Sequence, residues 1–172
     1  MRNVFRLLFI GALLFALSGL ASGAEDIPGF KGYTWGTSFE VVEQGKSLKW
    51  FRKTGRNEEL AEYVGVKDTE RDQKGEPIGG AFYRFYNNRL VGGEVTFFDR
   101  SLYLEAVGAL EDKMGKATYR RGTESSYVLE STIIMYSSQH MRIQFMSKQY
   151  VSESEKREDE AKKMLDNSRF YN

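Results

Sequence analysis

The chain has 172 residues, with 25 lysines and arginines against 24 aspartates and glutamates, and it has no cysteine. A formal net charge of +1 lacks the basic surplus with which proteins displace counterions from duplex nucleic acid, so we expect no nucleic-acid partner. Without cysteine there can be no disulfide, no thiol nucleophile and no thiolate metal site.

The N-terminus has the three parts of a secretory signal peptide. Arg2 and Arg6 are basic, residues 7–20 are largely apolar, and small residues follow at 21–24. The apolar run is shorter than the roughly 20 residues that cross a bilayer as a helix, and an uncleaved anchor is the alternative. We therefore expect a signal peptide over residues 1–23, a single domain over residues 24–172, and a periplasmic or secreted protein that meets a membrane only through its leader.

The first elements of the domain are a short aromatic strand over residues 33–35 and a helix over residues 38–44. Thr37 and Glu40 have the spacing of a capping box, and Ser38 is an alternative cap. Gly45 is placed to end the helix. Strands are expected over 48–53 and 62–67, and the charged segment 68–77 is expected to be a loop.

A hairpin is predicted over residues 81–98, around Asn87 and Asn88. A two-residue Asn-Asn turn is one alternative. We prefer a three-residue loop that includes Arg89, because it collects apolar side chains on one face: Tyr83, Phe85, Val91, Gly93, Val95 and Phe97. The glycine pairs 79–80 and 92–93 lack any phosphate-loop pattern and indicate a bulge or a close approach between strands.

The second half begins with the clearest helix, from a cap at Ser101 to Gly115, with apolar residues at helical spacing. Strands are expected over 118–121, 127–130, 132–136 and 141–146. A polar helix is expected over about 152–166, with Ser152 and Glu155 as a capping box. The order of helix and then strands thus occurs twice, and predicts an α+β fold: an antiparallel sheet with two helices packed on it, plus a charged C-terminal helix.

Two short motifs resemble small exported bacterial modules, namely the outer-membrane-assembly small-lipoprotein group and the β-lactamase-inhibitor-like domains. The motifs are Gly36 to Val42, at a helix entry, and Met114-Gly115-Lys116-Ala117, at a helix end. The resemblance covers about a quarter of the domain, and Ala117 stands where the family usually has proline. It implies a non-catalytic protein that binds other proteins at the cell envelope. The lack of a cysteine departs from the lipoproteins and favours a free periplasmic form.

Candidate chemistry is sparse in the sequence. His140 is the only histidine, lies in a predicted turn, and has neither a nucleophile nor metal ligands at a recognisable spacing. Asp68, Glu70 and Asp72 begin like a calcium loop, but Gln73 and Gly79 occupy positions that need glycine and glutamate. We therefore expect no cofactor, no metal and no catalytic residue.

The functional feature that we favour is a surplus of aromatic residues on the sheet face opposite the core. If Tyr83 and Phe85 point inward, a second set points outward together with either Trp50 or Phe51, and we take it as the partner-binding set: Phe82, Arg84, Tyr86 and Phe98. Aromatic residues and arginine supply most anchors of protein interfaces. Two other interpretations of these outward residues stay open. The face is covered by the terminal helix or a loop, or the protein is a small envelope enzyme or carrier of an apolar ligand, with a site between helix and sheet.

Overall fold

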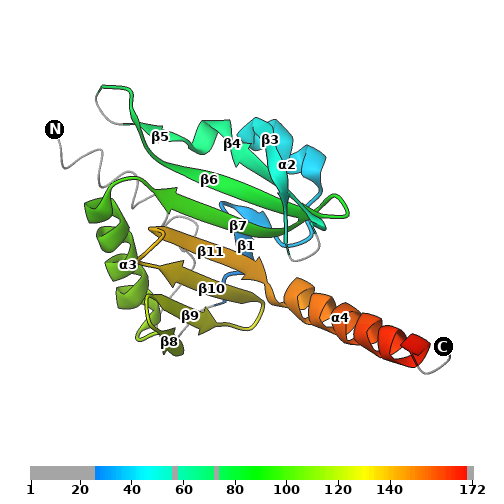
Figure 1. The fold of residues 1–172 in the computed structure, drawn as a ribbon. Helices are drawn as coiled ribbons and strands as arrows, with labels where there is room; N and C mark the ends of the chain where they lie inside the picture. The colour runs from blue at the N-terminus through cyan, green and yellow to red at the C-terminus, as the bar shows by residue number, and fades with distance from the viewer. Residues whose placement is uncertain (1–25, 56–57, 72–73, 170–172) are drawn as a thin grey trace.

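The computed structural model describes residues 26–55, 58–71 and 74–169, with the backbone alone over 161–169. An antiparallel sheet of nine strands forms the body of the molecule, and a two-stranded sheet of β1 (Gly29–Phe30) and β2 (Tyr33–Thr34) lies against it (Figure 1). The strands follow the order β3-β4-β6-β7-β11-β10-β9-β8, with β5 paired to β6. Their bounds are β3 Leu48–Thr54, β4 Leu60–Gly65, β5 Glu70–Arg71, β6 Pro77–Tyr86, β7 Arg89–Phe97, β8 Tyr119–Arg121, β9 Glu124–Val128, β10 Thr132–Ser137 and β11 Arg142–Ser147.

The sheet is built from two halves with the same order of elements. Helix α2 (Phe39–Lys46) precedes β3, β4, β6 and β7, and helix α3 (Arg100–Met114) precedes β8, β9, β10 and β11. The last strands of the two halves, β7 and β11, pair at the centre of the sheet. This confirms the predicted α+β class and the repeated order of a helix followed by strands.

Both helices pack on one face of the sheet, which we call the inner face. From α2, Val42 is fully buried and Phe39 lies against Tyr63 and Phe85, with ring centroids 4.8 and 5.3 Å apart. From α3, the Tyr103 ring packs on Phe97 at 5.8 Å. Apolar side chains at alternate strand positions complete one continuous core: Ala81, Tyr83, Val95, Ile134, Tyr136, Ile143 and Phe145. We call the opposite side of the sheet the outer face.

The segment before α2 fills the inner face between the two helices. Phe30 of β1 packs on Tyr83 and Phe145, with centroids 5.1 and 5.4 Å apart. It lies so close to β7 that a Cβ atom at Gly93 would come within 2.2 Å of the ring. Trp35 donates a hydrogen bond of 2.7 Å from Nε1 to the Thr132 hydroxyl. The predicted close approach at Gly92 and Gly93 is thereby confirmed.

The ends of α2 differ from those predicted. The helix begins after Ser38, the alternative cap, although the Ser38 side chain makes no capping bond. The Thr37 hydroxyl instead donates to the Thr34 carbonyl at 2.8 Å, so the Thr37–Glu40 capping box does not form. At the other end, Gly45 lies inside the helix, and Ser47 adopts the left-handed conformation with φ 52°.

The hairpin of β6 and β7 combines the two registers that the sequence left open. Asn87 and Asn88 form a two-residue turn with φ 46° and 63°, and Tyr86 pairs with Arg89, so the preferred three-residue loop is wrong. A bulge then shifts the register between Arg84 and Phe85. It places Val91 on the outer face, and it restores the expected face for Tyr83, Phe85, Gly93, Val95 and Phe97.

Other boundaries also differ. Strand β9 covers Glu124–Val128, where a strand over 127–130 is predicted. The segment 68–77 is not entirely loop, since the 3-10 helix Val66–Asp68 ends at its first residue and strand β5 lies within it. Asp99, not Ser101, caps α3, because its carboxylate accepts the Ser101 and Leu102 amides. Helix α4 (Lys148–Arg169) begins four positions before the expected Ser152, so the Ser152–Glu155 capping box does not exist.

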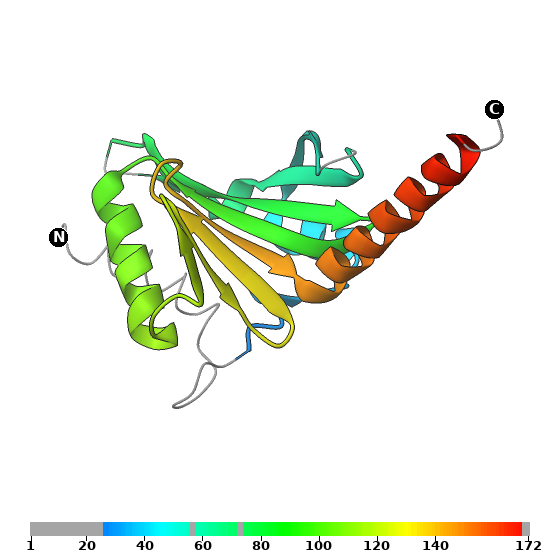
Figure 2. The ribbon, with the colours of Figure 1, turned by 60° about the horizontal axis from the view of Figure 1, so that its bottom comes forward.

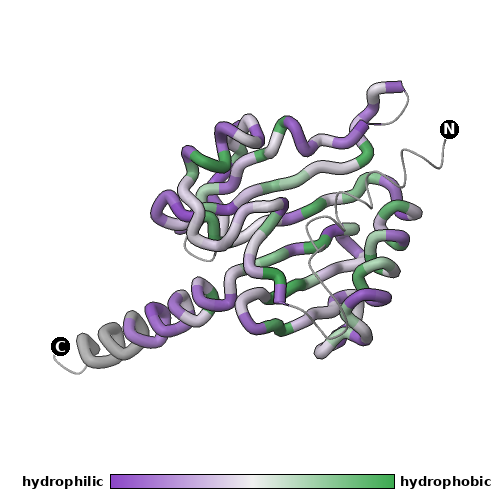
Figure 3. Tube along the Cα trace, turned by 180° about the vertical axis from the view of Figure 1, so that it is seen from behind, coloured by the Kyte–Doolittle hydropathy of each residue, from purple (hydrophilic) through white to green (hydrophobic). Residues whose placement is uncertain are grey.

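Helix α4 follows β11 directly and extends away from the sheet (Figures 1 and 2). Its described part is largely hydrophilic, as expected for a charged C-terminal helix (Figure 3). The predicted signal peptide over residues 1–23 lies outside the described residues. Among the residues that are described, no helix is long and apolar enough to cross a membrane.

Candidate outer-face binding surface

The outer face carries three of the four predicted binding residues. Phe82, Arg84 and Tyr86 alternate along β6 and point away from the core formed by Tyr83 and Phe85. Phe98 lies apart from them, in the bend after β7, where its amide bonds the Ile78 carbonyl at 2.9 Å. It is 59% exposed, at the end of β6 opposite to Tyr86. The structure thus brings the first three residues onto one face and leaves Phe98 beyond its margin.

Arg84 is buried in a row of charges that crosses four strands. Its Nε donates to Glu62 at 2.7 Å and its Nη2 to Glu94 at 2.6 Å. Glu62 also accepts from Arg52 Nε at 2.7 Å. Since the Arg84 residue is only 7% exposed, it bridges two carboxylates and is not presented to a partner.

Glu94 is held in its ionised form by its neighbours. Burial alone would raise the pKa of Glu94, but the Arg84 charge, the hydrogen bonds from Gln144 and Arg84, and the Arg142 charge outweigh it, so the pKa lies below its ordinary value. Gln144 donates to this carboxylate at 2.6 Å and Thr96 at 3.0 Å. The charged row therefore links both halves of the sheet.

An aromatic patch borders this row at the β3 margin of the sheet. The Phe51 and Phe82 rings pack with centroids 5.3 Å apart, and the Arg52 guanidinium lies 5.0 Å from the Phe51 centroid. Phe51 is 45% exposed and Phe82 is half-buried. Trp50 is 60% exposed, on the other side of the same strand. Both Trp50 and Phe51 are thus exposed, where the sequence required only one of them.

Tyr86 is covered by the base of α4. Its ring packs on Tyr150 at 5.4 Å, and the Arg157 guanidinium lies 4.7 Å from its centroid. The buried residues Leu60, Val91 and Tyr150 form a small second core at this corner. The terminal helix therefore covers one corner of the outer face, and Phe51 and Phe82 lie outside that corner.

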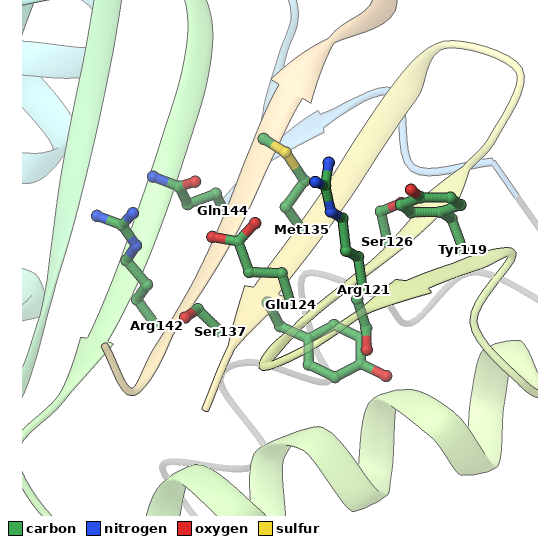
Figure 4. Close-up of a pocket in the computed structure, with 10 residues that line it drawn as sticks. Tyr119, Arg121, Glu124, Ser126, Met135, Ser137, Arg142 and Gln144 are labelled. Carbon is green, nitrogen blue, oxygen red and sulfur yellow. The ribbon is translucent and has the colours of Figure 1, made fainter. Parts of the chain in front are cut away.

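A cavity of about 260 Å³ opens on the outer face of the second half of the sheet. Figure 4 shows that side chains from β8, β9 and β11 point into it, with Glu124 between Arg121 and Arg142. Arg142 Nη1 is 4.0 Å from Glu94, whose closer partners are Arg84 and Gln144. This arrangement offers two guanidinium groups, one carboxylate and several hydroxyls for polar contacts.

One cross-strand row connects the cavity to the aromatic patch. Residues directly opposite each other from β8 to β4 share the outer face, in the order Tyr119, Ser126, Met135, Gln144, Glu94, Phe82 and Val64. Sequence reasoning missed the cavity because only the pairing of four short strands brings these side chains together. The available signal was the alternation of polar Arg142 and Gln144 with buried apolar residues along β11.

The other chemical candidates are not assembled into a site. His140 is exposed in the turn between β10 and β11, where its amide bonds the Ser137 hydroxyl at 3.4 Å. Within the described ranges, no group of three or more histidine, aspartate or glutamate residues could hold a metal ion. Asp68 pairs with Lys46 at 3.0 Å and accepts from Tyr83 at 2.5 Å, so it links α2 to the sheet.

Comparisons with known proteins give no relative for this chain. No family model matches it, and neither the curated proteins nor the solved structures contain a significant match.

Proposed function

We propose that this protein is an exported, non-catalytic module of the cell envelope, and that it binds another protein through the outer face of its sheet. The observation that carries the proposal is that other elements cover the two faces of the sheet to different extents. The inner face is covered by α2, α3 and the segment around Phe30, whereas among the described residues the outer face is covered only at the corner under α4. Exposed aromatic side chains are typical anchors of protein interfaces, and here they lie beside a row of hydrogen-bonded charged side chains.

The envelope location and the absence of catalysis rest on the sequence. The predicted leader and the lack of cysteine favour a periplasmic or secreted protein. The resemblance to small envelope modules supports binding to protein, and its two motifs lie where α2 begins and where α3 ends.

The test is photo-crosslinking in the native envelope. A photoreactive amino acid in place of Phe51 or Phe82 should crosslink to one discrete protein. The same group in place of Leu104, which is 54% exposed on α3, is the matched control and should not. The double variant Phe51→Ala with Phe82→Ala should lose that crosslinked protein when the probe is at Val64, which lies opposite Phe82 on the outer face, and should keep a thermal midpoint within a few degrees of the parent. Equal crosslinking from all positions, or from Leu104 alone, contradicts the proposal.

One observation favours the carrier alternative. A hollow of about 340 Å³ lies beside α2 and the hairpin tip, with Phe39, Tyr63 and Phe85 among its lining residues. An environment-sensitive apolar dye tests this alternative. Saturable dye binding that is lost in Phe39→Ala, and unchanged in the Phe51→Ala and Phe82→Ala double variant, would favour a carrier over a protein-binding module.

A further inference from the structure

Strand β3 is an unusually exposed edge of the sheet. It is the first strand in the sheet order, and within the part of the chain that the structure describes it pairs only with β4. Every residue from Lys49 to Lys53 is exposed, on both faces of the strand. The opposite edge, β8, has only three residues, which leaves little backbone for pairing. With seven residues, β3 is long enough to accept another strand.

An edge strand presents a row of backbone N–H and C=O groups that no neighbouring strand satisfies. An extended peptide can add to such an edge, and then its backbone supplies affinity while its side chains supply specificity. On β3 the side chains beside that row include two large aromatics: Trp50 on the inner side and Phe51 on the outer side, at 60% and 45% exposure. An added strand would therefore meet an apolar contact on each of its faces.

The charges of β3 select the kind of strand that can add. Lys49, Arg52 and Lys53 are its only charged residues. Arg52 is paired with Glu62, whereas within the described part of the chain Lys49 and Lys53 make no ion pair. A second copy of β3 would place like charges opposite one another, and the bulge between Trp50 and Arg52 adds twist that opposes flat pairing. An acidic strand meets attraction at the same positions.

From this geometry we infer that β3 is a docking edge for an extended acidic segment of the partner protein, which adds to the sheet as a further antiparallel or parallel strand. The inference rests on the proposed binding function and specifies the local structure and charge of the partner. Lys49 lies on the outer side, opposite Val64, and Lys53 lies on the inner side, opposite Ala61. Each attracts acidic side chains of the added strand on its own side, and Trp50 and Phe51 contact its apolar side chains.

The probe is a capped ten-residue peptide of alternating valine and glutamate, added to the mature protein. As a strand it carries all its glutamates on one face and all its valines on the other, so the glutamates lie beside Lys49 with the valines beside Trp50, or beside Lys53 with the valines beside Phe51. Its binding should shift the emission of exposed Trp50 and slow amide hydrogen exchange in residues 48–54. A form of the peptide that is N-methylated at every residue cannot pair along either of its backbone edges, and it should not bind. A peptide of alternating valine and lysine should not bind.

Charge reversal supplies the sharper test. The double variant Lys49→Glu with Lys53→Glu should bind the glutamate peptide at least about tenfold more weakly than the parent does. It should also bind the lysine peptide, which the parent does not. Lys116→Glu with Lys156→Glu, two exposed lysines elsewhere, changes the net charge equally and should leave the affinity unchanged. The inference is overturned if the glutamate peptide fails to bind, if it protects amides elsewhere and none in β3, or if the fully N-methylated form binds equally well. Those results leave the crosslinking from Phe82 unaffected, so this inference and the proposed function can fail separately.

Discussion

Arg84 and Glu94 lie on the neighbouring strands β6 and β7 and form a 2.6 Å ion pair on the sheet face that α2 and α3 do not cover. Each residue is only 7% exposed. The same guanidinium also holds Glu62, which is 1% exposed, so one cation bridges two carboxylates. Burial of this row on an otherwise open face gives the sheet a rigid polar centre.

Removal of the Arg84 side-chain charge should be strongly destabilising. Arg84→Met keeps most of the side-chain volume. It leaves Glu94 with only the more distant Arg142, 4.0 Å away, and Glu62 with Arg52 alone. Breaking one partner of a buried pair costs about 3–5 kcal/mol. Urea unfolding of the parent and the variant measures the difference.

Arg120→Met is the matched control for this prediction. Arg120 forms a pair of similar length with Glu111, at 2.6 Å, but its side chain is 59% exposed. Exposed pairs contribute about 0–1 kcal/mol, so this variant should unfold close to the parent. Equal losses in the two variants would show that burial of the Arg84 row carries no special weight.

Acid should weaken the fold in part through Glu94. The pKa of Glu94 is lowered in the folded protein, so its contribution to stability is complete above the ordinary value of 4.5 and is lost as the pH falls through the lowered folded pKa. The stability difference between the parent and Glu94→Gln should therefore shrink as the pH falls below about 4.5. Unfolding curves at a series of pH values measure it. A difference that stays constant from neutral pH to strongly acidic pH would mean that Glu94 keeps no lowered pKa.

The α+β class and most of the strands could be predicted because alternation of apolar residues marks buried strand faces. The inner positions Tyr83, Val95 and Ile143 all follow this rule. Local signals also placed the end of α3 correctly, at Gly115, although Asp99 and not Ser101 caps its start. The hairpin was harder, because a two-residue turn and a bulge have opposite effects on register and cancel beyond Arg84. Because the turn and the bulge each change the strand register by one residue in opposite directions, the alternation of apolar residues alone cannot reveal them.

The candidate site was less predictable than the fold. Alternation on β6 correctly places Phe82, Arg84 and Tyr86 on one face, but it says nothing of what lies opposite them. Arg84 is buried because Glu62 and Glu94 flank it on two other strands, at sequence separations of 22 and 10 residues. Tyr86 is covered because α4 begins at Lys148, earlier than its capping pattern indicated. Both facts depend on contacts between distant segments.

Gly93 should be intolerant of any side chain. A Cβ atom there would come within 2.2–2.4 Å of three ring atoms of Phe30, which is itself packed on Tyr83 and Phe145. Gly93→Ala must therefore displace Phe30 and is expected to cost about 1–3 kcal/mol, the usual penalty of overpacking a core. Thermal or urea unfolding measures it.

Gly80→Ala provides the comparison for Gly93→Ala. Gly80 lies on the adjacent strand β6, and a Cβ atom there would meet nothing within 4 Å. This variant should be as stable as the parent or slightly more stable, because alanine loses less backbone entropy on folding than glycine. If both alanine variants behave alike, Phe30 is free to move and the close approach is not rigid.

Tyr150 should control the attachment of α4 to the sheet. It is 6% exposed, packs with Leu60 and Val91, and donates a hydrogen bond of 2.8 Å to Glu59. Tyr150→Ala removes the ring and leaves a void in the small second core, at a cost of about 3 kcal/mol. Amide exchange within α4 should accelerate, while exchange in the central strand β11 should change only in proportion to the lost global stability.

Two milder variants separate the contributions to this attachment. Tyr150→Phe removes only the hydrogen bond to Glu59 and should cost about 1 kcal/mol. Arg157→Ala removes the guanidinium that lies over the Tyr86 ring and should cost about 0.5–1 kcal/mol. Because α4 covers Tyr86, its release should add that ring to the exposed outer face, and a photoreactive group in place of Tyr86 should then crosslink more strongly in Tyr150→Ala than in the parent. Unchanged exchange in α4 after loss of the Tyr150 ring would mean that other contacts hold the helix against the sheet.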